Sequence, residues 1–442
     1  MRTAPGLFIL IVLSSGCQTH TNQRIAGHFD GYIEYQNKKL NLNIDFQYRD
    51  GKQIALLSIP DNLQLDKPFT TVEYNPPDIE LGVKDGETPV TIHATLIKNI
   101  IEGKVDGSIP ATIHLIKVDN YTEAEKTYTV EAVLLDNNGI KLLANLYLPK
   151  TTLQSPAVII VSGSGNHTRD EYNGAAALFA SSGIATFTVD KRNVTNIDGL
   201  NLKQVNSDIV TMSELVGDVE TAFKFLQNQK KIKRDKIGLL GFSLGAVEVP
   251  VVAAKHQEIA FVIAISGNAT TDKEFIINQG LNKLKEKSFN EHVIRKAEHF
   301  YNDLFNYAKT RQNAKALQLK LDEAYSEQWG AVCFPRKVPN EDELKYLLTW
   351  NNFEFDPADY WRKINVPCLV VYGEKDKYIP IEKSINILND IFKTRKGLLT
   401  LKVYPASDHT IRLIPAKENF EFPRYADGYI NDVQNWLLKQ TH

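Results

Sequence analysis

Gly241-Phe242-Ser243-Leu244-Gly245 is the most informative stretch of this chain. It follows the apolar run Ile237 to Leu240 and opens into Ala246-Val247-Glu248, which is compatible with a helix. A strand, a sharp turn and a helix are therefore expected, with serine at the apex. Such a turn strains the backbone of the serine, and glycine on either side lets the chain and the following helix approach closely. The turn would expose the Ser243 hydroxyl beyond the end of a strand.

Two later loops place polar residues just past the ends of other apolar strands. Asp376 follows the strand Cys368 to Tyr372, and His409 follows the strand Leu399 to Val403. Open α/β sheets keep their chemistry at the carboxyl ends of the strands. The order Ser, Asp, His along the chain is that of the α/β-hydrolase triad.

These three residue types suit nucleophilic catalysis. A serine hydroxyl is a weak nucleophile until an imidazole takes its proton, and a carboxylate orients that imidazole and stabilises its charged form. We therefore predict Ser243 as nucleophile, His409 as general base and acid, and Asp376 as the orienting carboxylate. The alternatives are a helix-capping serine, a loop aspartate that caps the next helix and a surface histidine. Asp408 is the other candidate carboxylate, disfavoured because adjacent side chains rarely face each other.

The tetrahedral intermediate of such a reaction needs backbone N-H donors for its oxyanion. One should be the N-H of Leu244, and the other should come from the loop 162–167 that follows the strand Ala157 to Val161. We favour the Ser164 N-H, with Gly163 or Gly165 as alternatives. A phosphate-binding loop is disfavoured because no Gly-Lys-Ser/Thr follows.

Two other features beside these motifs have structural interpretations. His167 is expected to hydrogen-bond locally, and contact with substrate is the less favoured alternative. The run Asp190-Lys191-Arg192 is interpreted as bracing the loops beside the active site through charge-assisted hydrogen bonds.

From about Gly27 to the end, the chain resembles bacterial α/β-hydrolases of the carboxylesterase type that carry a small N-terminal β domain. The motifs that carry the resemblance are Ser162 to Gly165 with Arg169-Asp170-Glu171, Val189 to Arg192, Asp218-Val219, Gly241 to Gly245 and Gly373 to Asp376. The resemblance implies ester hydrolysis through an acyl-enzyme.

The chain departs from these relatives at four positions. They usually have histidine and glutamate where this chain has Phe242 and Leu244, glycine in place of Asn193 and proline in place of Asn166. No member of the triad is lost, so the departures bear on substrate preference.

An antiparallel β domain is expected over residues 24–118. Alternation of apolar and polar residues from Leu40 to Tyr48 is typical of a half-buried strand. Asp50-Gly51 then turns the chain into a second strand. Strand-like runs follow at Val90 to Leu96 and Ala111 to Val118. Packing against the rest of the chain is its favoured role, and holding a substrate or partner is the alternative.

Residues 119–442 are expected to form an α/β-hydrolase domain. After a hairpin that begins at Tyr128, strands alternate with helices, which predicts a doubly wound, mostly parallel sheet. A long periodic insertion at about 268–352 is interpreted as a helical cap. Trp329, Phe334 and Trp350 are candidates to line its pocket, with packing inside the cap favoured for each.

The N-terminal 23 residues predict export. Arg2 precedes the apolar run Leu7 to Leu13, which is too short to span a bilayer and is typical of a signal peptide. Ser15-Gly16-Cys17 resembles a lipoprotein processing site, so Cys17 would be lipidated and residues 18–23 would form a tether. The leucine usual three residues before the cysteine is Ser14 here. The expected location is a bacterial membrane, on the periplasmic side or at the cell surface, and simple export is the alternative.

Composition excludes some partners. The chain has 442 residues, 43% of them hydrophobic, and a net charge of -2, so a large core is expected and the basic face of a nucleic-acid-binding protein is not. Besides Cys17, only Cys333 and Cys368 are present, without histidine or cysteine neighbours at metal spacing. We predict neither metal nor cofactor. Whether Cys333 and Cys368 form a disulfide is left open by the sequence.

The sequence thus predicts a serine hydrolase acting on carboxylic esters. A serine peptidase of the prolyl-oligopeptidase type and an acyl thioesterase are the alternatives within enzymes. A glycan-binding or partner-binding surface lipoprotein is the alternative outside them. The expected partners are a small ester and, through Cys17, a membrane, while the oligomeric state is left open.

Overall fold

The computed structural model describes residues 24–85, 88–151, 153–192, 210–344, 354–415 and 419–441. The predictions for the signal peptide, the tether, Cys17, Asn193 and Trp350 lie outside these residues. The chain divides into two compact units. One comprises Met1–Leu57 and Pro68–Tyr121, and the other comprises Ser58–Lys67 and Thr122–His442.

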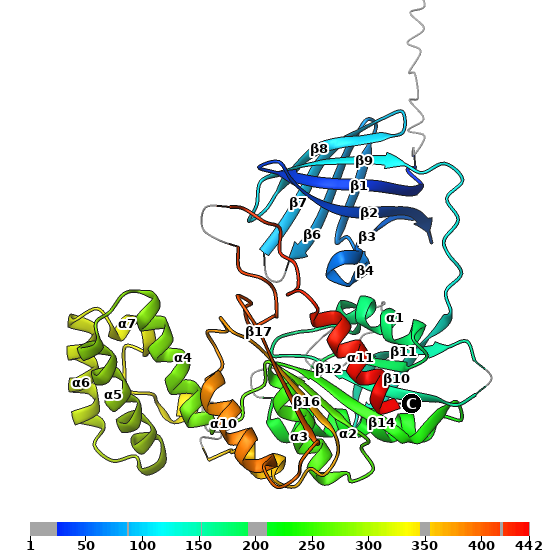
Figure 1. Ribbon diagram of the computed structural model, residues 1–442. Coiled ribbons are helices and arrows are strands. Elements are labelled where there is room, and N and C mark those ends of the chain that lie inside the picture. The colour runs from blue at the N-terminus through cyan, green and yellow to red at the C-terminus, as the bar shows by residue number, and fades with distance from the viewer. Residues whose placement is uncertain are drawn as a thin grey trace, which may run out of the picture. The chain divides into compact units, whose positions relative to one another are not determined.

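A nine-stranded antiparallel sheet forms the N-terminal part of the chain, in the order β4-β3-β2-β1-β9-β8-β7-β6-β5 (Figure 1). Its strands are β1 Gly27–Tyr35, β2 Lys38–Arg49, β3 Lys52–Ile59, β4 Gln64–Pro68, β5 Thr71–Asn75, β6 Asp78–Asp85, β7 Thr88–Ile97, β8 Ile100–Asp106 and β9 Ala111–Lys117, and Pro60–Asn62 is a 3-10 helix, η1. The alternation in β2 buries Leu42, Ile44 and Phe46. That pattern is why the sequence predicts this strand. Five of the nine strands, β1, β4, β5, β6 and β8, were not foreseen from the sequence.

The second unit contains an eight-stranded mixed sheet in the order β10-β11-β13-β12-β14-β15-β16-β17. Its strands are β10 Tyr128–Asn137, β11 Ile140–Pro149, β12 Ser155–Val161, β13 Ala185–Val189, β14 Ile232–Phe242, β15 Val262–Ile265, β16 Cys368–Gly373 and β17 Leu399–Tyr404. The hairpin β10-β11 is antiparallel, and β12 to β17 are parallel to one another. The predicted doubly wound fold is confirmed.

Helices cover both faces of this sheet. On one face α2 (Met212–Gln227), α3 (Leu244–Lys255) and α10 (Ile381–Phe392) bury Val216, Val249 and Leu388 against the strands. On the other face α1 (Asn173–Ser181) and α11 (Tyr429–Thr441) bury Phe179 and Leu437. The inner strands are buried on both faces, which explains their continuous apolar sequences.

The insertion between β15 and β16 forms a helical cap. It contains α4 (Asp272–Glu286), α5 (Glu291–Thr310), α6 (Ala314–Ser326) and α7 (Gly330–Cys333) (Figure 1). The short helix α9 (Ala358–Trp361) precedes β16. Trp329 and Phe334 lie in the cap's own core, where both pack edge-on against Phe300. The structure therefore shows the favoured prediction for Trp329 and Phe334, which is packing inside the cap.

The two cysteines of the described residues are free thiols. Cys333 lies in the cap and its Sγ contacts the Gly280 carbonyl at 3.3 Å, whereas Cys368 is buried in β16. Burial raises the pKa of Cys333 to about 11 and that of Cys368 to about 12. The disulfide that the sequence left open is not formed.

The core contact of α2 yields a stability prediction. Leu226 is fully buried against the sheet, so Leu226→Ala should lower the free energy of unfolding by about 2–5 kcal/mol through lost burial and a cavity. Leu319 in α6 is 70% exposed, and Leu319→Ala should change stability by less than about 0.5 kcal/mol. Urea unfolding followed by tryptophan fluorescence measures both, and equal losses would contradict the packing described.

Candidate active site

The turn at Ser243 joins β14 to α3 and has the backbone strain that the sequence predicts. Ser243 has φ 50° and ψ -113°, a conformation that costs an L-residue about 1–3 kcal/mol. A Cβ on Gly241 would lie 2.2 Å from the Gly245 carbonyl, and one on Gly245 would lie 2.3 Å from the Val161 carbonyl. Only glycine fits at these two positions. The Ser243 N-H donates to the Ile265 carbonyl at 2.8 Å.

The structure brings Ser243, His409 and Asp376 together. The Ser243 Oγ lies 2.9 Å from His409 Nε2, and His409 Nδ1 lies 2.6 Å from Asp376 Oδ2. A carboxylate accepts hydrogen bonds, so Nδ1 carries the proton and Nε2 is left to accept from the serine hydroxyl. The Asp376 side chain is fully buried.

Asp376 and Asp408 make different contacts. The other oxygen of Asp376 accepts from the N-H groups of Tyr378 and Ile379 at 2.8 and 3.2 Å, which orients the carboxylate. Asp408 instead accepts from the N-H groups of Thr410 and Arg412 within its own turn. Asp408 therefore shapes the loop, and Asp376 contacts the imidazole.

Two residues beside His409 were not foreseen from the sequence. Ser266, which follows β15, donates its hydroxyl to the His409 carbonyl at 2.7 Å. The Tyr378 ring packs edge-on against the His409 imidazole with centroids 5.1 Å apart, and Tyr378 is 53% exposed. Tyr378 follows Asp376 by two residues, so its place in that loop is the one signal that could have suggested it.

The loop after β12 lies directly beside the serine. A Cβ on Gly163 would lie 3.4 Å from the Ser243 Cβ. Ser164 is exposed in this loop, and Leu244 is the first residue of α3. The two N-H groups predicted for the oxyanion thus belong to segments that flank Ser243.

His167 is held locally and faces two acceptors. Its Nδ1 lies 2.7 Å from a Glu171 carboxylate oxygen, and its Nε2 lies 2.8 Å from the Ser164 carbonyl. Both ring nitrogens must carry protons to make these two hydrogen bonds, so the arrangement favours the imidazolium. The Glu171 carboxylate accordingly raises the pKa of His167 above its usual value, against the opposing effect of burial.

Charged residues at the end of β13 connect the surrounding loops. Arg169 pairs with Asp190 at 2.8 Å, and both side chains are buried. Arg192 contacts Asp218 and Glu214 of α2 at 2.7 and 2.9 Å. Desolvation raises the pKa of Asp190, and the hydrogen bonds from Arg169 oppose that shift. These are the contacts of bracing residues.

The cap contacts the loop that carries Asp376. In α4, Asn278 and Asn282 donate side-chain hydrogen bonds to the carbonyls of Tyr378 and Lys377 at 3.1 and 2.7 Å. The cap helix and the acidic loop are therefore linked next to the imidazole.

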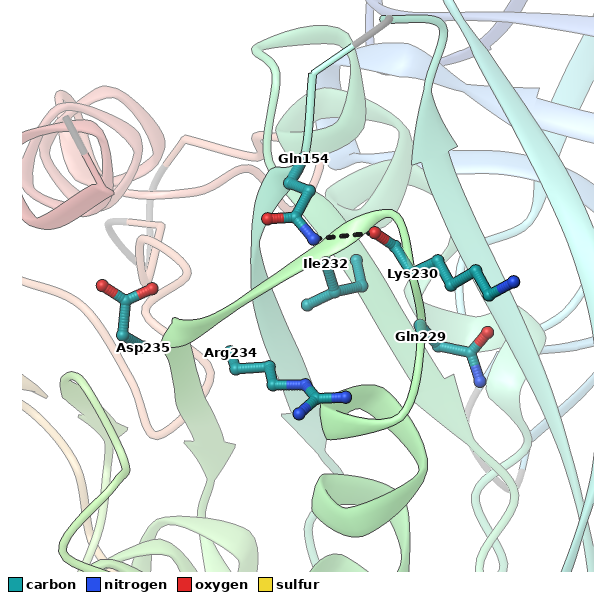
Figure 2. Close-up of a pocket in the computed structure, with 6 residues that line it drawn as sticks. All are labelled: Gln154, Gln229, Lys230, Ile232, Arg234 and Asp235. Atoms are coloured by element: carbon teal, nitrogen blue, oxygen red, sulfur yellow. Dashed lines mark hydrogen bonds between the residues drawn. The ribbon is translucent and has the colours of Figure 1, made fainter.

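A hollow elsewhere on the sheet is unrelated to this site. It is lined by Gln154, Gln229, Lys230, Ile232, Arg234 and Asp235 (Figure 2). It lies where the register between β12 and β14 shifts, at the amino ends of these strands. Ser243 follows the carboxyl end of β14, so the hollow is at the opposite end of the strand from the serine.

The chain is similar in sequence to known hydrolases. A family model described as BAAT / Acyl-CoA thioester hydrolase C terminal matches residues 219–330, which include the turn at Ser243. Esterase EstD of Thermotoga maritima is 26% identical over 316 residues, which cover 68% of this chain and 66% of that protein. The chain has the α/β-hydrolase fold.

Two further similarities are more distant or less informative. An uncharacterized 31.7 kDa protein from the traX-finO intergenic region of Escherichia coli is 23% identical over 255 residues, 57% of this α/β-hydrolase and 83% of that protein. A Pyrococcus horikoshii acylaminoacyl peptidase structure has a TM-score of 0.45 and 12% identity, covering 86% of this chain and 51% of that one.

The described residues contain neither a cluster of metal-binding side chains nor a helix suited to span a membrane. No group of three or more histidine, cysteine, aspartate or glutamate side chains within them is arranged to hold a metal ion. Among the same residues, no helix combines the length and apolar character needed to cross a membrane.

The contacts of His167 predict how the charge of its imidazole affects stability as the pH changes. Because its pKa is raised in the folded state, its contribution to stability should be complete below pH about 6.5 and should be lost as the pH rises through the raised value. NMR titration of the His167 ring should give a pKa above 6.5, and Glu171→Gln should lower it. An unchanged pKa in that variant would contradict the assigned cause.

Proposed function

We propose that this α/β-hydrolase cleaves carboxylic esters through an acyl-enzyme formed on Ser243. The observation that supports the proposal most directly is the continuous hydrogen-bonded series from Ser243 through His409 to Asp376. The three residues come from loops that follow β14, β17 and β16. They meet at the carboxyl ends of parallel strands, where α/β enzymes carry out their chemistry.

Acylation follows from the positions of these groups. The Ser243 Oγ attacks the ester carbonyl while its proton passes to His409 Nε2, and Asp376 stabilises the imidazolium through Nδ1. The N-H groups of Leu244 and Ser164 are proposed to bind the oxyanion of the tetrahedral intermediate. The intermediate collapses as His409 returns the proton to the departing alcohol.

Deacylation repeats these steps with water. His409 removes a proton from water, the resulting hydroxide attacks the acyl carbonyl, and the acid leaves as Ser243 regains its proton. No cofactor takes part in the proposed reaction. The proposed lipid attachment at Cys17 would set this chemistry beside a membrane.

The choice of an ester over the alternatives rests on the relatives. Esterase EstD is similar over two thirds of the chain, whereas the family model that names an acyl-CoA thioester hydrolase matches a quarter of it. A thioesterase is therefore the second candidate, since the same groups can attack a thioester. A peptidase would need a site for an N-terminal amine or a proline ring, and the sequence has no acidic pair that suggests one.

A substrate panel separates these activities. We expect the protein to cleave p-nitrophenyl esters from acetate to decanoate and to leave aminoacyl-nitroanilides intact. Acyl-CoA thioesters measured beside them test the second candidate. A fluorophosphonate probe should label Ser243 in every case in which the protein is a serine hydrolase. Failure of the wild-type protein to react with the probe would favour a binding protein with an inactive hydrolase fold.

Replacement of the nucleophile should separate activity from stability. Ser243→Ala should lower kcat by about 10⁶-fold and leave the thermal melting temperature within about 3 °C, because the hydroxyl contributes little to folding. Ester hydrolysis and a thermal melt of the same preparation measure the two effects. Retained hydrolysis would show that the nucleophile lies elsewhere.

The two neighbouring acids provide a matched comparison. Asp376→Asn should lower kcat by about 10⁴-fold, because the amide would favour the wrong imidazole tautomer. Asp408→Asn keeps an oxygen for the Thr410 and Arg412 N-H groups, so less than a tenfold loss is expected, on the order of the effects of exposed polar groups. A greater loss in Asp408→Asn would reverse the assignment of the carboxylate.

A further inference from the structure

Three consecutive carbonyl groups beside Ser243 each face a cationic side chain. Lys191 Nζ hydrogen-bonds to the Gly163 carbonyl and lies 3.4 Å from the Ser162 carbonyl. His167 Nε2 donates to the Ser164 carbonyl at 2.8 Å. The ammonium group has three N-H donors, so one lysine can serve both carbonyls.

These contacts determine which way the amides of the loop point. A trans peptide is planar and directs its C=O and N-H to opposite sides. Since the Gly163 carbonyl faces Lys191, the N-H of Ser164 in the same peptide points away from the lysine. Gly163 itself lies against the Ser243 Cβ. Lys191 therefore determines the orientation of the peptide that supplies the proposed Ser164 donor.

Lys191 also reaches the helix that supplies the other donor. Its Nζ lies 3.6 Å from Glu248 Oε1, and both side chains are at most 6% exposed. Glu248 is in α3, four residues after Leu244, on the same face and one turn along the helix. No hydrogen-bond partner satisfies Glu248 Oε1 within the described residues, so the lysine is the group that compensates its charge there.

Burial makes this arrangement costly. Desolvation lowers the pKa of Lys191 and raises that of Glu248, and the charge of each partner opposes the shift of the other. Replacement of a buried ion pair by apolar residues is often neutral or stabilising. Stability alone therefore does not require a lysine at the end of β13.

We propose that Lys191 is a positioning residue. It holds the two N-H groups of the oxyanion hole, those of Ser164 and Leu244, in the correct positions relative to each other. Through Gly163 and Ser162 it orients the loop after β12, and through Glu248 it is paired with the helix that begins at Leu244. The inference rests on the proposed function, because the oxyanion hole belongs to that reaction. Lys191 itself contacts neither the serine nor the substrate carbonyl in this mechanism.

A double-mutant cycle distinguishes positioning from charge compensation. The variants are Lys191→Met, Glu248→Gln and the double variant, and Lys191→Gln retains a neutral donor. Arg192→Met is the matched control: the adjacent cation is equally buried, but its contacts are Asp218 and Glu214 and it does not touch the loop carbonyls. For each, we would measure kcat, KM, the thermal melt and the rate of fluorophosphonate labelling of Ser243.

If Lys191 positions the loop, Lys191→Met should lower kcat by about 10²-fold, which is the lower end of the range for loss of one oxyanion donor. Its KM should stay within about threefold of the wild-type value. The double variant should stay as slow, because removal of the Glu248 charge does not reorient the Gly163 carbonyl. Glu248→Gln should lose less than tenfold, and Lys191→Gln should fall between Lys191→Met and wild type. Arg192→Met should lower the melting temperature without lowering kcat.

Recovery of wild-type kcat in the double variant would show that Lys191 only compensates Glu248, and the proposal would be overturned. Unchanged kcat in a folded Lys191→Met protein would overturn it as well. If Lys191→Met does not fold, two other variants test the proposal. These are the double variant, which leaves no unpaired buried charge, and Lys191→Gln.

The labelling rate keeps this test independent of the substrate. Ser243 displaces fluoride from the phosphorus of the probe, and negative charge develops on an oxygen that occupies the same hole. If the wild-type protein is labelled but cleaves no ester, the proposed function fails. The labelling rates of the Lys191 variants still test the positioning role, and equal rates in wild type and the double variant would refute it.

Discussion

The backbone conformation of Ser243 is the constraint on which the site depends. A left-handed φ at a serine is unfavourable, so the surrounding sheet must impose it. The neighbouring strand does so through the hydrogen bond from the Ser243 N-H to the Ile265 carbonyl. Gly241 and Gly245 remove the Cβ atoms that would prevent the close approach. The serine hydroxyl consequently lies beyond the strand ends, within 2.9 Å of His409.

Ion pairs at the end of β13 connect this edge of the sheet to other segments of the chain. Arg169, Lys191 and Arg192 each join a buried or half-buried acid from another segment. Ion pairs of this kind contribute little net stability, because desolvation offsets their attraction. The contacts of Lys191 with the carbonyls of Ser162 and Gly163 have a different consequence, because we propose that they set the orientation of the peptide that faces Ser243. On that proposal, geometry more than stability accounts for a lysine buried at this position.

The cap is built as a small domain with its own core and polar contacts to the site. Trp329 and Phe334 are buried among the cap helices, so their bulk stabilises the cap. Among the side chains that link the cap to the hydrolase sheet are the amides of Asn278 and Asn282, which bind the loop after Asp376. Glu286 of the same helix pairs with Lys377 of that loop at 2.7 Å. The exposed ring of Tyr378 lies in that loop beside His409. Substrate preference is therefore expected to depend on this loop as well as on the residues that flank Ser243.

From the amino-acid sequence one could predict the strand-turn-helix at Ser243, the buried parallel strands, the positions of Asp376 and His409 at strand ends, and the choice of Asp376 over Asp408 as the orienting carboxylate. These features follow from local patterns of glycine and apolar residues, which are set by backbone geometry. Only the tertiary structure shows that Lys191 reaches the loop carbonyls, that Ser266 and Tyr378 lie beside His409, and that the N-terminal sheet has nine strands. Such contacts join residues as far as 143 positions apart. Strand order and register create them, and neither is encoded in any short stretch of the chain.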